Sequence, residues 1–194
     1  VYGLSDRIVV ISDGFKQNLL GKGVPGAKLD VIPNWVDTAV MAPRPKDNPL
    51  SRRHGLHDKF VLLYSGTISI SSNVALEKIL DTARLLAAEK DIVFVIAGEG
   101  LKKEPLQARA AAMGLGNVRF LPFQPYSDLP FLLASSDVLL VPLDSEKSHL
   151  SVPSKLYNFM AAGRPILGFA TPESEVAAII RDNGCGLAVS PEDP

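Results

Sequence analysis

The segment with the clearest chemistry runs from Ser151 to Lys155. Here Ser151-Val152-Pro153-Ser154 leads straight into a predicted helix that starts near Lys155. A helix N-terminus carries unpaired N–H groups and a partial positive charge, so it can hold an anion. A cation in the first turn does not stabilise a helix, which favours a charge-assisted contact between Lys155 and a phosphate. The alternative is that Ser154 caps the helix and Lys155 lies in solvent.

Glycines at the ends of two predicted strands are the second candidate feature. Ser65-Gly66-Thr67 follows the apolar run Phe60–Tyr64, and Gly98 follows the apolar run Ile92–Ala97. Glycine lets the backbone approach a ligand closely, and such loops lie beside nucleotides in doubly wound sheets. The alternatives are a serine-rich turn and a simple strand-to-helix turn, and the residues alone leave both open.

A third candidate follows another short strand, at Phe123 and Gln124. An aromatic ring can stack on a base, and an amide can read a base edge. The alternative places Phe123 in the core, where aromatic residues after a short strand are usually found.

Alternating apolar runs and amphipathic stretches predict the elements that position these residues. The runs are continuous, as expected of parallel strands buried on both faces. The predicted strands are Ile8–Ile11, Leu29–Ile32, Phe60–Tyr64, Ile92–Ala97, Val118–Leu121, Val138–Val141, Pro165–Phe169 and Gly186–Val189. The predicted helices between the later strands are Asn73–Ala88, Leu106–Met113, Leu129–Ala134, Lys155–Ala162 and Ser174–Arg181. The pattern predicts an α/β fold with a doubly wound, Rossmann-like parallel sheet, six-stranded from Phe60 onward.

The proline-rich stretch 33–54 interrupts this pattern. It holds four prolines and no sustained period, so it reads as an interdomain linker. Residues 1–32 are too few to fold alone and are expected to be the tail of a preceding lobe. Residues 55–194 form the predicted main lobe, and the abrupt ends predict a truncated chain.

The composition narrows the function classes. Hydrophobic residues make up 46% and the net charge is −1, so a folded core is expected and a nucleic-acid surface is not. A single cysteine, Cys185, excludes a disulfide framework and a multi-thiolate metal site. No apolar run spans a bilayer and the first residues resemble no export signal, so a cytoplasmic location is expected, with membrane association of the full-length form left open. Asp144 and Glu146 supply too few ligands for a dedicated metal site.

Several motifs, in order and spacing along essentially the whole chain, resemble one known family. These are Asp6–Ser12, Lys28–Asp37, Tyr64–Thr67, Ile96–Gly100, Leu121–Phe123, Asp137–Pro142 and Val152–Pro165. They resemble the retaining glycosyltransferases of sequence family 4 (group 1), which have the two-lobed GT-B fold. The Val-Pro-Ser-Lys version is similar to a subgroup that builds bacterial surface polysaccharides, including fucosyl- and acetylfucosaminyl-transferases.

The resemblance implies that this lobe binds a nucleoside-diphosphate sugar. It places Gly66, Thr67, Ser154 and Lys155 at the diphosphate; Gly98, Phe123, Gln124 and Asn158 at the base and ribose; and His149 and Leu150 at the sugar. The chain departs from the family pattern at four positions. Thr67 and Ser72 stand where an Arg and a Lys are usual, and Leu150 and Asn158 stand where the family has a Glu-x7-Glu pair.

The expected function is therefore retaining sugar transfer by the full-length protein, as a hexosyltransferase. The acceptor, a saccharide or a lipid-linked saccharide, would bind to the N-terminal lobe, and this piece alone would be inactive. No metal or other cofactor is expected, because basic residues and a helix dipole can replace a metal. The alternatives are a nucleotide-sugar epimerase of the same fold and a non-catalytic nucleotide-binding lobe.

Overall fold

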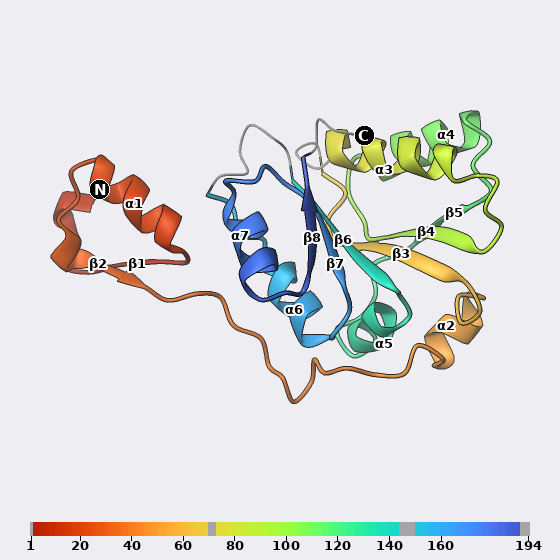
Figure 1. Ribbon diagram of the computed structural model, residues 1–194, viewed down its shortest axis with the longest axis horizontal. Coiled ribbons are helices and arrows are strands. Elements are labelled where there is room, and N and C mark those ends of the chain that lie inside the picture. Colours follow the sequence, from red (N-terminus) through yellow and green to blue (C-terminus); the bar gives the residue numbers. More distant parts are fainter. Residues whose placement is uncertain (1, 70–72, 144–149, 191–194) are drawn as a thin grey trace.

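The main body of the molecule is a twisted parallel sheet covered by helices on both faces (Figure 1). The computed structural model describes residues 2–69, 73–143 and 150–190. Six strands pair in the order β5-β4-β3-β6-β7-β8, and every pairing is parallel. The strands are β3 (Phe60–Ser65), β4 (Ile92–Ala97), β5 (Val118–Leu121), β6 (Val138–Pro142), β7 (Ile166–Phe169) and β8 (Gly186–Val189). The predicted doubly wound parallel α/β sheet is thus confirmed.

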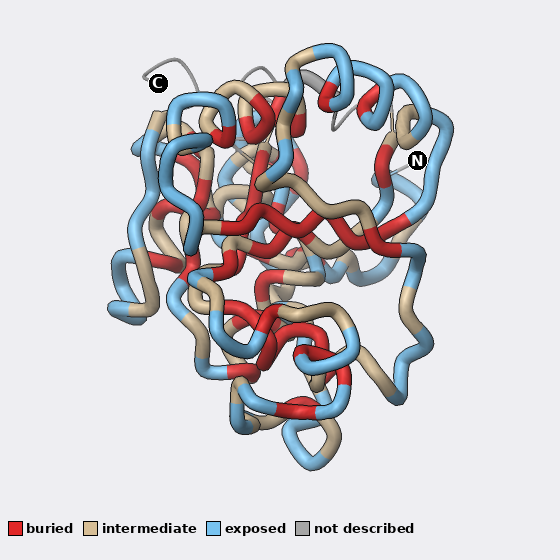
Figure 2. The backbone as a smooth tube through the Cα atoms, turned by 90° about the vertical axis from the view of Figure 1, so that its right-hand side faces the viewer, coloured by how far each residue is buried: buried red, intermediate tan, exposed pale blue. Residues whose placement is uncertain are grey.

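The two faces of the sheet carry different helices because successive strand residues point to opposite sides. Leu63 and Val95 pack in the cluster that includes residues of α2 (Pro49–Arg53), α5 (Leu129–Ala134), α6 (Lys155–Ala161) and α7 (Glu175–Asp182). Their neighbours Tyr64 and Ile96 pack in the cluster that includes α3 (Asn73–Leu85) and α4 (Lys103–Ala112). Figure 2 shows buried residues running through the middle of the body, with exposed segments around them.

The helix boundaries differ slightly from the sequence predictions. Helix α3 ends at Leu85, three residues before the predicted end, and α4 starts at Lys103, three before the predicted start. Both shifts lie at helix ends, where the apolar period gives little information.

The strand order reverses between β3 and β6. Chain connections leave β3 toward one edge of the sheet and β6 toward the other. In an open parallel sheet this switch point leaves a crevice outside the carboxyl ends of the two strands, where ligands bind. The crevice here is bounded by the loop after β3 and by α6, which follows β6 in the chain.

The N-terminal residues form a small unit of their own (Figure 1). It consists of η1 (Tyr2–Leu4), β1 (Ile8–Val10), α1 (Asp13–Gly21), η2 (Gly26–Lys28) and β2 (Leu29–Val31), with β1 and β2 parallel. Its core is a separate cluster around Val10, Leu19, Val24 and Leu29. The backbone N–H of Gly14, in the first turn of α1, donates to Glu175 Oε1 of the main lobe at 2.6 Å.

The stretch 33–54 contains the short helix α2. This helix was not predicted from the sequence, because the stretch shows no helical period. Asn48 caps α2 through a capping box with Ser51, and Pro49 is its first residue. Met41 and Leu50 are buried in the same cluster as α5 and α6. Lys46 also forms an ion pair with Asp137, whose carboxylate accepts the Val61 N–H. The second half of this stretch is therefore packed onto the lobe.

In the ranges that the structure describes, no helix combines the length and apolar character needed to cross a membrane.

Candidate functional site

A pocket of about 230 Å³ opens at the switch point of the sheet. Its walls come from the ends of β3 and β4, the segment after β5, and the helices α5 and α6. The lining residues are Ser65, Gly66, Ala97, Phe123, Gln124, Tyr126, Leu129, Lys155, Asn158 and Phe159. Five of the predicted site residues therefore meet in one cavity, namely Gly66, Phe123, Gln124, Lys155 and Asn158.

Lys155 supplies the positive charge of this pocket. Its Nζ lies 4.2 Å from the centre of the Tyr64 ring, and a Cβ added to Gly66 would come within 2.6 Å of it. No carboxylate of the described residues is within ion-pair distance of it. Burial lowers the pKa of Lys155 from its ordinary value of 10.5 to about 8. The alternative that Lys155 lies in solvent is therefore wrong.

The floor of the pocket is made of two loops whose backbones touch. Gly66 N–H donates to Ala97 O at 3.0 Å, and Ile68 N–H donates to Glu99 O at 2.9 Å. At Gly98 the φ is +157° and an added Cβ would lie 1.9 Å from the Gly66 carbonyl oxygen. Gly98 itself is buried and does not line the pocket. The close approach of the neighbouring loop therefore explains why position 98 is a glycine. The contact of Gly98 with a nucleotide stays a prediction.

Exposed aromatic side chains form the rim of the pocket. Phe123 is 70% exposed and Tyr126 is 57% exposed. The alternative that Phe123 belongs to the core is therefore wrong. The Gln124 Nε2 donates to Pro122 O at 2.9 Å, so the amide oxygen of Gln124 remains an acceptor toward a ligand.

Ser154 occupies the N-cap position of α6 without capping it through its side chain. Its backbone is already helical, with φ −57° and ψ −29°, and no hydrogen bond joins its side chain to the first turn. Helical dihedrals turn the hydroxyl away from the N–H groups that a β-region cap reaches. The alternative that the Ser154 side chain caps the helix is therefore wrong. Since α6 has only seven residues, the charge available to an anion comes mainly from Lys155.

Three further predicted residues lie outside the pocket lining. Thr67 is exposed and its carbonyl accepts the Tyr64 hydroxyl at 2.7 Å. Ser154 is exposed, and Leu150 is half-buried. His149 lies outside the described residues, as do Asp144 and Glu146 of the rejected metal motif.

The sequence did not single out Ser65, Ala97, Tyr126, Leu129 or Phe159 as pocket residues. Ser65 and Ala97 are the last residues of β3 and β4, so their place at the carboxyl edge could have been read from the strand ends. Leu129 and Phe159 carry only an apolar helical pattern, which does not distinguish a pocket wall from a core position.

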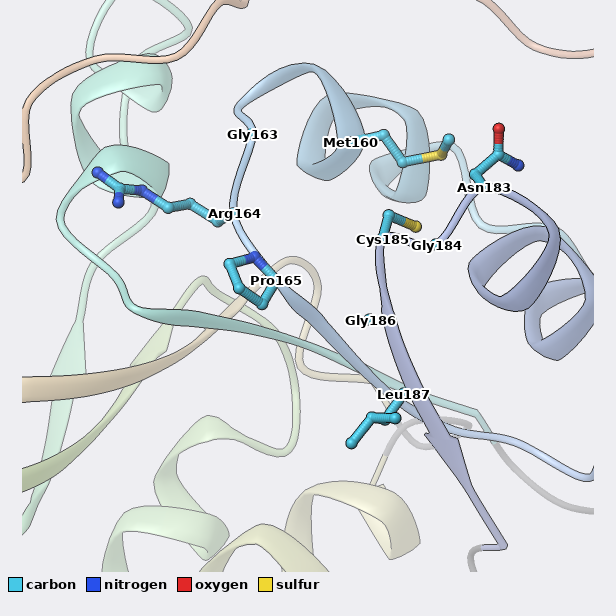
Figure 3. Close-up of a pocket in the computed structure, with 9 residues that line it drawn as sticks. All are labelled: Met160, Gly163, Arg164, Pro165, Asn183, Gly184, Cys185, Gly186 and Leu187. Atoms are coloured by element: carbon cyan, nitrogen blue, oxygen red, sulfur yellow. The ribbon is translucent and has the colours of Figure 1, made fainter.

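A larger and more open hollow, of about 530 Å³, lies at the amino ends of β7 and β8 (Figure 3). Met160, Cys185 and Leu187 are among its walls, and Arg164 is at its border. The Arg164 guanidinium turns away and donates to the carbonyl oxygens of Arg44 and Ala134. Among the described residues that line this hollow Arg164 is the one charged residue, and its guanidinium turns away, so the smaller pocket is the better candidate site.

Comparison with known proteins identifies the chain's relatives. A model of the family described as Glycosyl transferases group 1 matches residues 59–194. The chain is 30% identical, over its whole length, to the probable glycosyltransferase WbjE of Pseudomonas aeruginosa, of which it covers 48%. It is also 30% identical, over 96% of its length, to the putative colanic acid biosynthesis glycosyl transferase WcaI of Escherichia coli (strain K12), of which it covers 46%. The chain thus spans about half the length of the curated relatives it matches.

Solved structures share the fold at low identity. Anabaena Alr3699/HepE in complex with UDP matches with a TM-score of 0.76 and 16% identity, over 96% of this chain and 50% of that one. WaaG, a glycosyltransferase involved in lipopolysaccharide biosynthesis, matches with a TM-score of 0.74 and 18% identity, over 95% of this chain and 49% of that one. The fold is that of the Rossmann-like lobe of GT-B glycosyltransferases.

Proposed function

The chain belongs to the glycosyl transferases group 1 family, and on that premise we propose that its switch-point pocket binds the nucleoside diphosphate of a sugar donor. The observation that carries the proposal is the Lys155 ammonium, which lies beside Gly66 without a carboxylate partner among the described residues. Removing a cation from water is costly unless an anion compensates it. A bound diphosphate would supply that anion.

The remaining walls suit the other parts of a nucleotide. The exposed rings of Phe123 and Tyr126 offer flat apolar surface to a base, and the Gln124 amide oxygen can accept from a ring N–H. Asn158 lies one helical turn after Lys155 on the pocket side of α6 and can hydrogen-bond ribose hydroxyls. In this proposal the base lies at the rim, the ribose lies beside Asn158, and the phosphates lie deepest, next to Lys155.

We further infer that the donor is a UDP-sugar and that the transfer retains the anomeric configuration. The HepE complexes support uridine, since that protein binds UDP and has the same fold. In the transfer, the acceptor hydroxyl bonds to the anomeric carbon and loses its proton to the departing phosphate oxygen. The bond from the anomeric carbon to that oxygen breaks. Lys155 would stabilise the negative charge that develops on the leaving diphosphate.

The acceptor is proposed to be a saccharide or a lipid-linked saccharide held by the part of the protein outside residues 55–194. The relatives WbjE and WcaI, the latter named for colanic acid biosynthesis, support an acceptor of this class. Proton NMR of the product would report the anomeric configuration, and an inverted centre would refute retention. Because Lys155 supplies positive charge, we propose that donor binding needs no metal, and a chelator should leave the UDP affinity unchanged.

Titration calorimetry with UDP, GDP, ADP and dTDP tests the proposal directly. UDP should bind more tightly than UMP, because the second phosphate reaches Lys155. Lys155→Ala should weaken UDP binding about ten- to a hundredfold, from the roughly 1.5–3 kcal/mol of a charged hydrogen bond. Lys90→Ala is the matched control, since Lys90 is an exposed lysine in the turn just before β4, at the opposite end of the strands.

Two results would redirect the assignment. If none of the four diphosphates binds, the lobe has no donor site and a non-catalytic role becomes the better explanation. If the full-length protein converts the UDP-sugar to an isomer without any acceptor, the protein is an epimerase of the same fold.

A further inference from the structure

The partner that holds the Lys155 ammonium is an aromatic ring. Its Nζ lies 4.2 Å from the centre of the Tyr64 ring, well inside the range of a cation–π contact. It also lies beside Gly66, where an added Cβ would be 2.6 Å from Nζ and 3.3 Å from the Tyr64 hydroxyl. The ammonium thus lies over a ring face, next to a backbone position that has no side chain.

The Tyr64 ring is itself fixed in place. It is 1% exposed and belongs to the cluster that packs β3 and β4 against α3 and α4. Its hydroxyl donates to the Thr67 carbonyl at 2.7 Å, within the loop that follows β3. One side chain therefore contacts both the ammonium and the loop beside it.

A ring face suits an anion-binding lysine better than a carboxylate would. A carboxylate would neutralise the ammonium and occupy its N–H donors, so an incoming phosphate would have to displace it. The quadrupole of a ring attracts the cation without a full negative charge. The three N–H donors of the ammonium then remain available to phosphate oxygens.

Building on the proposed function of this pocket, we propose that Tyr64 is the positioning residue for donor diphosphate binding. Its ring holds the Lys155 ammonium beside Gly66, and its hydroxyl holds the Thr67 carbonyl of the adjoining loop. Tyr64 touches no phosphate in this arrangement and acts through Lys155. The lowered pKa of Lys155 is consistent with this position, because the ring compensates the loss of hydration of the ammonium less than a carboxylate would.

The test varies the charge distribution of the ring while keeping its shape. Tyr64→Phe keeps the ring face and removes only the hydroxyl, so it is the reference for the ring exchange. A pentafluorophenylalanine at position 64 has nearly the same size but no negative face, and it should weaken UDP binding about three- to tenfold relative to Tyr64→Phe. Thermal unfolding of both variants reports whether the fold is retained.

Two controls separate positioning from a merely structural role. Uridine has no phosphate, so its affinity should be the same with both rings. In the Lys155→Ala background, exchanging the rings should not change UDP affinity, because the cation that senses the ring is gone.

Equal UDP affinity of the two ring variants would overturn the proposal. So would a loss that appears equally for uridine, or one that persists in the Lys155→Ala background. If wild-type protein binds UDP and Lys155→Ala weakens that binding while the ring exchange has no effect, only the role of Tyr64 fails. If wild-type protein does not bind UDP, the proposed donor site fails as well.

Discussion

Raising the pH from 7 to 9 is expected to weaken UDP binding about five- to tenfold, because Lys155 loses its proton across that range. Burial sets the pKa of Lys155 at about 8 in the free protein. A diphosphate beside the ammonium favours the charged form, so the pKa of Lys155 rises when UDP binds. Affinity is then constant below the free pKa and falls above it.

The magnitude follows from the protonated fraction of Lys155 in the free protein. One pH unit below the pKa, about nine-tenths of the molecules carry the ammonium, and one unit above it about one-tenth do. The ratio of these fractions gives an upper limit of about tenfold, and the change is smaller if Lys155 in the complex also begins to lose its proton near pH 9. The β-phosphate has its own second pKa near 6, so it is largely ionised throughout the range.

The assay is titration calorimetry at both pH values in two buffers with different ionisation enthalpies. At pH 9 the wild-type protein should take up about 0.4 to 0.8 proton for each UDP bound, because a ten- to hundredfold contribution raises the pKa of Lys155 by one to two units. Lys155→Ala should take up none through this group, and its own pH profile corrects for titration of the ligand and of other side chains. If the ratio of wild-type to Lys155→Ala affinity is the same at both pH values, Lys155 does not act on the phosphate as a titrating cation.

Two further predictions concern stability, both measured by urea unfolding. Gly98→Ala should lower the free energy of unfolding by more than about 2 kcal/mol, because the new Cβ would lie 1.9 Å from the Gly66 carbonyl oxygen. Gly116→Ala should leave the free energy of unfolding nearly unchanged, because no atom of the described residues lies within 4 Å of a Cβ added there. Equal losses in the two variants would contradict the steric argument. Ser154→Ala should change stability by less than about 0.5 kcal/mol, since Ser154 makes no side-chain cap. Ser174→Ala should cost about 1 kcal/mol, because the Ser174 side chain accepts the Ala177 N–H at 3.2 Å, and a larger loss at Ser154 would refute the assignment.

The strands and their parallel arrangement could be predicted because burial on both faces produces continuous apolar runs. Phe60–Tyr64 and Ile92–Ala97 were located to within a residue in this way. Helix α2 was not predicted, because its five residues are too few to show a helical period. Its one sequence signal was Asn48 followed by Pro49, a cap residue before a favoured first helical residue.

Only those site residues that follow a strand or begin a helix could be predicted from the sequence. Gly66 and Lys155 were placed correctly in the crevice because each follows a strand or begins a helix at the switch point. The contact of Lys155 with Tyr64 joins residues far apart in the sequence, and no local pattern encodes it. The helical dihedrals of Ser154 likewise depend on how the chain enters α6, which residue types alone do not specify.

The hydrogen-bonded loops beneath the pocket also bear on the entropy of binding. Backbone hydrogen bonds join Gly66 to the last residue of β4 and Ile68 to the loop that follows it, and the Lys102 N–H donates to Ile68 O at 3.2 Å. A ligand therefore meets a floor whose backbone is already ordered. The conformational freedom lost on binding is largely that of rim side chains such as Phe123 and Tyr126, at roughly 0.5–1.5 kcal/mol for each immobilised side chain. Replacing a rim residue should accordingly change the entropy of binding more than replacing a residue of the floor, provided that the floor still folds.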